Sequence, residues 1–164
     1  MGRMDKRKAK YLGGKFGIRA VTGGILLAQL ILTIFFYRKS DGLFTAFFWF
    51  TDFQYLGSLI SGILILYLSG YFYGQVCGRQ VLINHKNYNL VGFKFAMFSL
   101  VVSAIGSSAV NFLIVGIEEV GRQGETPIKD YIIMPIYFIH FFGLAPALII
   151  GYWFGKQLRR RLRF

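Results

Sequence analysis

Residues 95–117 read FAMFSLVVSAIGSSAVNFLIVGI and contain no Asp, Glu, Lys or Arg. A hydrocarbon core about 30 Å thick is crossed by about 20 helical residues, which is close to the length of this stretch. Three further stretches share this character, and they occupy residues 20–37, 56–73 and 131–154. The sequence therefore predicts an all-α integral membrane protein in which residues 1–164 form a single four-helix transmembrane bundle.

The basic residues are distributed unevenly between the two sides of these spans. Of the 19 Lys and Arg residues, fifteen lie before the first span, between the second and third spans, or after the fourth. The other two loops carry four basic residues and six acidic ones. The positive-inside rule then places both termini in the cytoplasm. We expect an integral protein of a bacterial inner membrane with its N- and C-termini inside.

The net charge of +12 would suggest nucleic-acid binding if the protein were soluble. In a membrane protein, attraction to the anionic lipids of the inner leaflet accounts for most of this charge, at about 1 kcal/mol per basic residue near the surface. We therefore expect no direct contact with nucleic acid. The C-terminal tail is either a stop-transfer anchor or a docking site for an acidic cytoplasmic partner. Its basic residues after the span include Arg159, Arg160, Arg161 and Arg163.

Small residues recur at four-residue spacing in every span. Helices in lipid gain no hydrophobic energy by associating, so these residues matter because they let two backbones approach closely. The rows are Ala20, Gly24 and Ala28; Ser58 and Gly62, then Gly70, Gly74 and Gly78; Ser99, Ser103 and Ser107; and Gly143, Ala147, Gly151 and Gly155. This pattern predicts close packing of the four helices. The second and fourth rows extend far enough to join subunits of a homo-oligomer as well.

A short motif occurs twice, 81 residues apart. Residues 70–75 read GYFYGQ and residues 151–156 read GYWFGK. A duplicated helical hairpin would produce this recurrence and would give a pseudo-twofold axis along the membrane normal. Aromatic residues at the headgroup level and glycines at packed helix ends also recur independently. Both interpretations remain open on the sequence.

The first outer loop contains an aromatic segment, LFTAFFWFTDF, at residues 43–53. Eleven residues are too few to cross a bilayer, so we expect the segment to lie in the outer interface or to cover the mouth of the bundle. It acts either as an anchor or lid, or as a contact for a ligand or lipid.

Three polar residues fall at similar predicted depths. At 1.5 Å per residue, Gln29 lies about 12 Å, Asn111 about 9 Å and His140 about 14 Å below the outer boundary. Polar residues at such depth face the bundle interior and act as functional groups or as hydrogen-bonding contacts between helices. His140 alone changes its charge near neutral pH. We expect it to hydrogen-bond Asn111 or Gln29.

The chain lacks the usual signatures of membrane enzymes and carriers. No span contains an acidic residue, and Cys77 is the single cysteine, so neither a paired-cysteine redox site nor a cysteine metal cluster is expected. We predict no enzymatic activity, no cofactor and no metal. Three functions remain: a membrane subunit that assembles with itself or with a cytoplasmic partner, an oligomeric pore or solute passage, and an envelope protection or sensing protein such as a toxin-immunity or defence component.

Overall fold

The computed structural model describes residues 5–38, 42–48, 56–113 and 128–161. Every regular element in these ranges is a helix. In chain order they are α1 (Lys6–Tyr37), α2 (Leu43–Phe47), α3 (Leu56–Leu82), α4 (Tyr88–Asn111), the π-helix η4 (Lys129–Ile133) and α7 (Met134–Arg160). α1, α3, α4 and the continuous η4–α7 helix are long and apolar enough to cross a membrane. The prediction of a helical chain with four candidate spans is confirmed.

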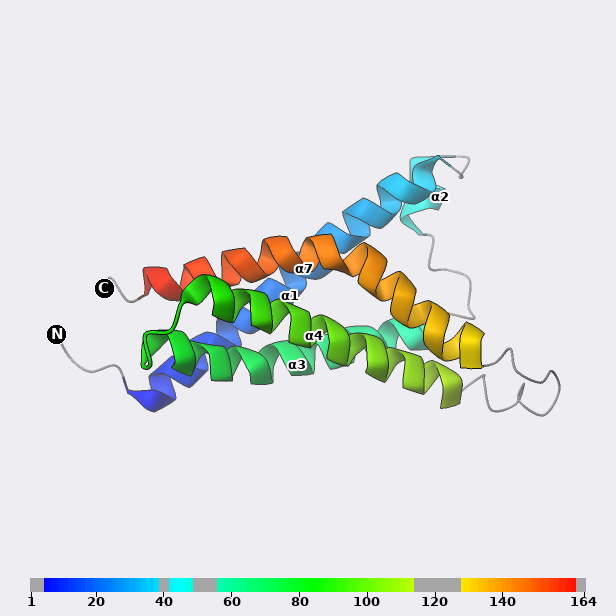
Figure 1. Cartoon of the computed structure of the whole chain (residues 1–164). Coiled ribbons are helices and arrows are strands. Elements are labelled where there is room, and N and C mark those ends of the chain that lie inside the picture. The colour runs from blue at the N-terminus through cyan, green and yellow to red at the C-terminus, as the bar shows by residue number, and fades with distance from the viewer. Residues whose placement is uncertain (1–4, 39–41, 49–55, 114–127, 162–164) are drawn as a thin grey trace.

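The four long helices form a ring in which sequence neighbours are antiparallel. α1 packs against α3, α3 against α4, α4 against α7, and α7 returns to α1. Figure 1 shows both ends of the chain on the same side of the molecule. We call this side the basic end; it consists of the first turns of α1 and α4 and the last turns of α3 and α7. The opposite side is the far end.

The helices continue past the predicted spans at the basic end. α1 begins at Lys6, where the Asp5 side chain accepts a hydrogen bond of 3.3 Å from the Arg7 backbone N–H. α4 begins at Tyr88, where Asn87 accepts one of 3.0 Å from the Asn89 N–H. Helices end where capping groups satisfy their free backbone donors, not where lysines and arginines first appear. The basic residues from Lys6 to Arg19, together with Arg79 and Lys94, are therefore helical.

A tight turn joins α3 to α4 at the basic end. His85 has a left-handed backbone with φ of 50°, and the Lys86 N–H donates to the Gln80 carbonyl at 3.0 Å. A left-handed residue is uncommon outside glycine and marks a position where the chain reverses sharply. This reversal sets α3 and α4 side by side with opposite directions (Figure 1).

The buried core lies towards the basic end. Phe95 and Phe154 stack there with ring centroids 4.0 Å apart, and Phe16, Val81 and Leu158 pack around them. Many large apolar side chains elsewhere along the helices are exposed, as in Phe141 at 78 %. Such extensive apolar exposure is typical of helices whose outer faces contact lipid rather than water.

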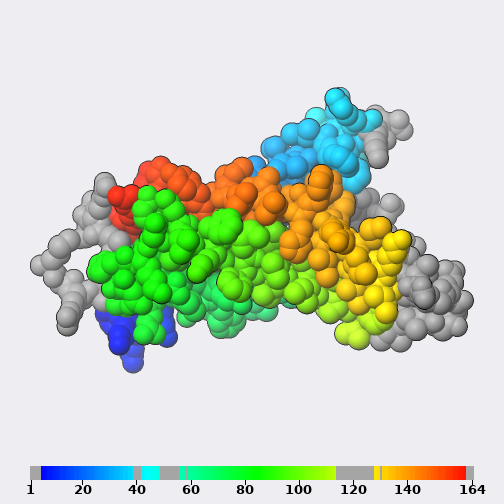
Figure 2. Space-filling view, in the orientation of Figure 1, coloured from blue at the N-terminus to red at the C-terminus, as the bar shows by residue number. Residues whose placement is uncertain are grey.

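The far end is more open than the basic end. The second half of α1 diverges from α3 and α4 and carries α2 with it, while Phe35 still packs against Phe142 of α7 with ring centroids 5.0 Å apart. Figure 2 shows the end of α1 and α2 projecting from the bundle. α7 bends near its middle, in the region of Pro146, whose missing N–H removes a backbone hydrogen bond. In η4 the Met134 N–H bonds the Lys129 carbonyl five residues earlier, directly before Pro135.

Candidate functional site

Glycines on facing helices lock α1 to α3 near the basic end. Gly13 and Gly17 of α1 lie against Gly70, Gly74 and Gly78 of α3. A methyl group added at Gly74 would lie 2.6 Å from the Gly13 carbonyl oxygen, and one at Gly78 would lie 2.5 Å from the Ala9 carbonyl oxygen. Because these neighbours are backbone atoms, they cannot swing aside. The two helices are in backbone contact, as small residues permit in membrane proteins.

The pair α4 and α7 meets in the same manner. Gly92 of α4 faces Gly151 and Gly155 of α7, and a methyl group at Gly151 would lie 2.7 Å from the Gly92 carbonyl oxygen. A methyl group at Gly155 would collide with the Tyr88 carbonyl oxygen. The bundle thus contains two helix pairs in backbone contact, α1 with α3 and α4 with α7, which we call the locked pairs. In each pair the two backbones approach most closely at the basic end.

The predicted rows of small residues are used unequally. Gly24 is loosely packed, since a methyl group there would lie 3.9 Å from the nearest neighbour atom, Cγ1 of Ile150. Gly62 faces the serines of α4: the Ser103 hydroxyl donates to its carbonyl at 2.8 Å, and a methyl group at Gly62 would lie 3.1 Å from Oγ of Ser107. Ala147 packs against the buried core.

The rows in α3 and α7 that were expected to reach a second subunit are occupied within the chain. Gly74 and Gly151 contact Gly13 and Gly92 of their own chain. Sequence reasoning missed these two partners because it ended the spans at the first charged residues. The signal was present in the sequence: Ala9, Gly13 and Gly17 form a separate row at four-residue spacing on the charged side of the first span.

Aromatic rings hold several cations of the basic end against the bundle. The Arg159 guanidinium donates to the Tyr88 hydroxyl at 2.7 Å, and its Cζ lies 4.6 Å from the centroid of the same ring. Arg161 lies over the Phe16 ring at 5.9 Å, and Arg19 lies over it at 6.0 Å. Cation–π contacts of this kind are worth about 0.5–1 kcal/mol at exposed sites. The predicted docking arginines at 159 and 161 therefore belong to a folded surface, whereas Arg163 lies outside the described residues.

An open hollow of about 250 Å³ lies between the start of α4 and the end of α7. Its lining residues are Tyr88, Tyr152, Lys156, Arg159 and Arg160. Three of these five are cations and none is an acid, and Nζ of Lys156 lies 5.8 Å from the centroid of the Tyr152 ring. The hollow combines positive charge with aromatic walls. Sequence analysis identified Arg159 and Arg160 but not Tyr88, Tyr152 or Lys156 as part of one site.

The three polar residues expected to share a layer have different surroundings. Nε2 of Gln29 donates to the Phe47 carbonyl at 2.7 Å and so ties α2 to α1. Nδ1 of His140 lies 2.8 Å from the Ile136 carbonyl one turn earlier in its own helix, instead of pairing with Asn111 or Gln29 as expected. Asn111 is only 3 % exposed, and its helix α4 lies diagonally across the ring from α1. The hydrogen bond expected from His140 to Asn111 or Gln29 is thus replaced by one within its own helix.

The remaining reactive or polar groups are dispersed. Cys77 is buried, with its thiol 3.9 Å from the Val91 carbonyl. Within the described ranges, Oγ of Ser99 and Oγ of Ser108 are buried without a hydrogen-bond partner, and no three His, Cys, Asp or Glu side chains gather where they could hold a metal ion. The basic end, with its hollow, is therefore the strongest candidate site in the part of the chain that the structure describes.

Comparison with protein-family models, with curated proteins and with solved structures gives no match to this chain.

Proposed function

We propose that the protein is a non-enzymatic integral membrane subunit whose basic end faces the cytoplasm and binds an acidic protein partner. The observation that carries this proposal is the construction of the basic end. There, backbone contacts of Gly13 and Gly17 hold the start of α1 against α3, and the first turns of α1 carry four exposed cations. A surface fixed before binding loses less conformational entropy when a partner docks.

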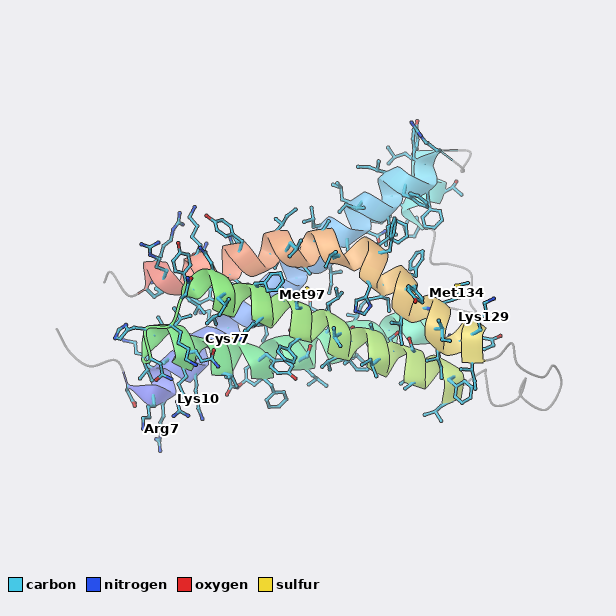
Figure 3. The ribbon with its side chains drawn as sticks, in the orientation of Figure 1. Arg7, Lys10, Cys77, Met97, Lys129 and Met134 are labelled. Atoms are coloured by element: carbon cyan, nitrogen blue, oxygen red, sulfur yellow. The ribbon has the colours of Figure 1, made fainter. Side chains whose placement is uncertain are left out.

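The first turns of α1 form the partner-binding surface in this proposal. Lys6, Arg7, Lys8 and Lys10 are all exposed there, and Figure 3 shows Arg7 and Lys10 extending away from the other helices. Asp5 is the only acidic residue that precedes the first span. Complementary charge of this kind steers an acidic partner and raises its association rate. The asymmetry of basic residues along the chain supports the cytoplasmic orientation.

A partner of different chemistry is favoured over self-assembly because the small-residue rows are already used. Gly74 and Gly151 face other helices of the same chain, so they offer no free ridge to a second copy. The passage hypothesis has less support, since Gln29 and His140 hydrogen-bond to backbone carbonyls near them rather than meeting at a constriction. Among the residues that the structure describes, no contact favours an envelope protection or sensing role.

Affinity purification from the native membrane tests this proposal. An acidic protein should co-purify in a fixed mass ratio at about 0.15 M salt and dissociate as higher salt screens the surface charges. The double substitution Arg7→Gln and Lys10→Gln should lower its recovery several-fold. Lys129→Gln, which removes an exposed cation at the far end, is the matched control and should leave recovery unchanged.

Two results would contradict the partner proposal. One is a purified protein whose mass equals that of a single chain at every salt concentration, and the other is equal loss of the partner in both variants. A mass equal to a whole-number multiple of the chain would instead favour self-assembly. Light scattering on the detergent-solubilised sample measures these masses.

The contacts also support a duplicated hairpin as the origin of the bundle. Gly17 faces Gly70 and Gly74, and Gly92 faces Gly151 and Gly155, which follow Gly70 and Gly74 by 81 positions. The glycines of the repeated motif thus make equivalent backbone contacts in the two helix pairs. Independent selection for close packing would favour glycines where two helices cross. It would not require the spacing of Gly70 and Gly74 in α3 to recur at Gly151 and Gly155 in α7. The two halves should therefore superpose pair on pair in an experimental structure.

A further inference from the structure

We propose that the hollow between α4 and α7 binds the phosphate headgroup of an anionic glycerophospholipid. The hollow is lined by Tyr88, Tyr152, Lys156, Arg159 and Arg160. This inference rests on the membrane placement proposed above. It does not depend on the protein partner, whose surface lies on α1.

The lining of the hollow suits a phosphate. Arg159 keeps its hydrogen bond to the Tyr88 hydroxyl through one guanidinium nitrogen, so further N–H groups remain to donate. Lys156 and Arg160 are exposed and add two more cations. Arginine and lysine are the usual phosphate ligands in proteins because their N–H groups form charge-assisted hydrogen bonds with phosphate oxygens. A phosphodiester would be surrounded by three positive charges without a competing carboxylate among the lining residues.

The place of the hollow along α7 favours a lipid over a free phosphate ion. The exposed face of α7 passes from Leu148 and Ile149 to Tyr152 and then to Lys156. Residues three and four apart lie on one helix face, so an apolar surface leads directly to the cations. Acyl chains would lie along that surface while the headgroup enters the hollow. Tyr152 and Trp153 are both exposed, as aromatic residues at the headgroup level of a membrane are.

Native mass spectrometry of the detergent-solubilised protein tests the inference. Dioleoyl phosphatidylglycerol and dioleoyl phosphatidylcholine share their acyl chains and differ in headgroup charge. We expect one phosphatidylglycerol to bind tightly and phosphatidylcholine to bind at least about tenfold more weakly. The double substitution Lys156→Gln and Arg160→Gln should reduce phosphatidylglycerol affinity about thirtyfold, since each of the two basic residues contributes about 1 kcal/mol to binding an anionic lipid surface.

The matched control removes the same number of charges at the same end. Arg7→Gln with Lys10→Gln should change phosphatidylglycerol affinity less than about twofold, because α1 does not line the hollow. Tyr88→Phe keeps the ring but removes the hydroxyl that positions Arg159, and it should weaken binding several-fold. Equal effects of the two double substitutions would mean diffuse charge attraction and would overturn the site. Equal binding of the two lipids would overturn it as well.

Competition experiments distinguish the headgroup from other ligands. Inorganic phosphate at millimolar concentration should not displace the lipid, and displacement would assign the hollow to a free phosphate. A poly-glutamate peptide should not displace it either, and displacement would assign the hollow to an acidic protein. Either result would overturn the proposed lipid site.

Failure of this site and failure of the proposed function give different results. Alkaline carbonate extraction should leave the chain in the membrane fraction, and its release would overturn the membrane placement. A chain that stays in the membrane but shows no preference for phosphatidylglycerol would overturn the headgroup site alone. Each double substitution should weaken a different interaction. The pair in α1 should lower recovery of the protein partner, and the pair in α7 should lower affinity for the lipid.

Discussion

At the scale of single residues, backbone contacts matter more than membrane depth. His140 was predicted to hydrogen-bond Asn111 or Gln29, and it instead contacts the Ile136 carbonyl of its own helix, while Gln29 donates to the Phe47 carbonyl of α2. In hydrocarbon, a polar side chain gains most from the nearest available partner, and a helix always offers the carbonyl one turn earlier. Equal depth fixes only one coordinate; rotation about the helix axis decides which side chains meet.

His140→Ala should therefore have a local effect. The contact it removes joins Nδ1 to the Ile136 carbonyl of the same helix, so we expect a loss of stability of about 0.6 kcal/mol, the average for polar contacts in membrane helices. Thermal unfolding in detergent measures this loss. Liposomes that contain the unmodified protein or the His140→Ala variant should show no flux of small solutes or ions across their membrane from about pH 5 to pH 8. A pH-dependent flux that His140→Ala abolishes would restore the passage hypothesis.

At the scale of the elements, the helices are organised by glycine contacts at the basic end. In each locked pair, a glycine on the helix that begins at the basic end, Gly17 of α1 or Gly92 of α4, contacts glycines on the helix that ends there. Contacts between backbones bring many atoms within van der Waals distance without ordering long side chains. Beyond these contacts the second half of α1 diverges from α3 (Figure 1) and keeps its contact with α7 through side chains such as Phe35 and Phe142.

Substituting these glycines should destabilise the bundle in proportion to the backbone clash. Gly74→Ala places a methyl group 2.6 Å from the Gly13 carbonyl oxygen and should cost about 1–3 kcal/mol, as overpacking commonly does. Gly24→Ala is the matched control, because its methyl group would meet Ile150 at 3.9 Å. It should be neutral or slightly stabilising, since alanine favours helix over glycine. Equal melting temperatures for the two variants would contradict the assignment of the locked pair.

At the scale of the whole molecule, the most closely packed part of the bundle and the cations of the hollow lie at the same end. The buried core, the glycine contacts, the chain termini and the hollow with its three cations all lie towards the basic end. We expect a rigid half on the side of the anionic leaflet and a more open half on the other side. The open half carries α2, whose Phe44 is 77 % exposed and suited to the membrane interface. The part of the aromatic segment from residue 49 onward lies outside the described residues.

Cysteine labelling in intact cells tests the predicted orientation. On a Cys77→Ala background, Lys86→Cys at the basic end should be protected from an impermeant maleimide, and Lys129→Cys at the far end should react. Both positions are exposed, so access to solvent depends on the side of the membrane rather than on burial. Cell lysis before labelling controls for reactivity and should expose both positions. If only the variant at position 86 were labelled in intact cells, the predicted orientation would be wrong, and the basic end would face outward.

The sequence by itself determined the helical class, the four candidate spans and the unequal distribution of charge. Each of these follows from local composition: an uncharged stretch of about 20 residues is recognisable without knowledge of its neighbours. The repeated motif at Gly70 and Gly151 also pointed to the right helices for close packing.

Only the tertiary structure decided which small residues meet and which cations form a site. Gly13 and Gly92 pair with distant glycines because of how α1 and α4 are rotated and crossed against α3 and α7. Arg159 reaches Tyr88, 71 residues earlier, because α4 begins where α7 ends. Spacing along one helix fixes the face on which a residue lies. The partner of that face depends on the crossing of two helices, which non-local backbone contacts determine.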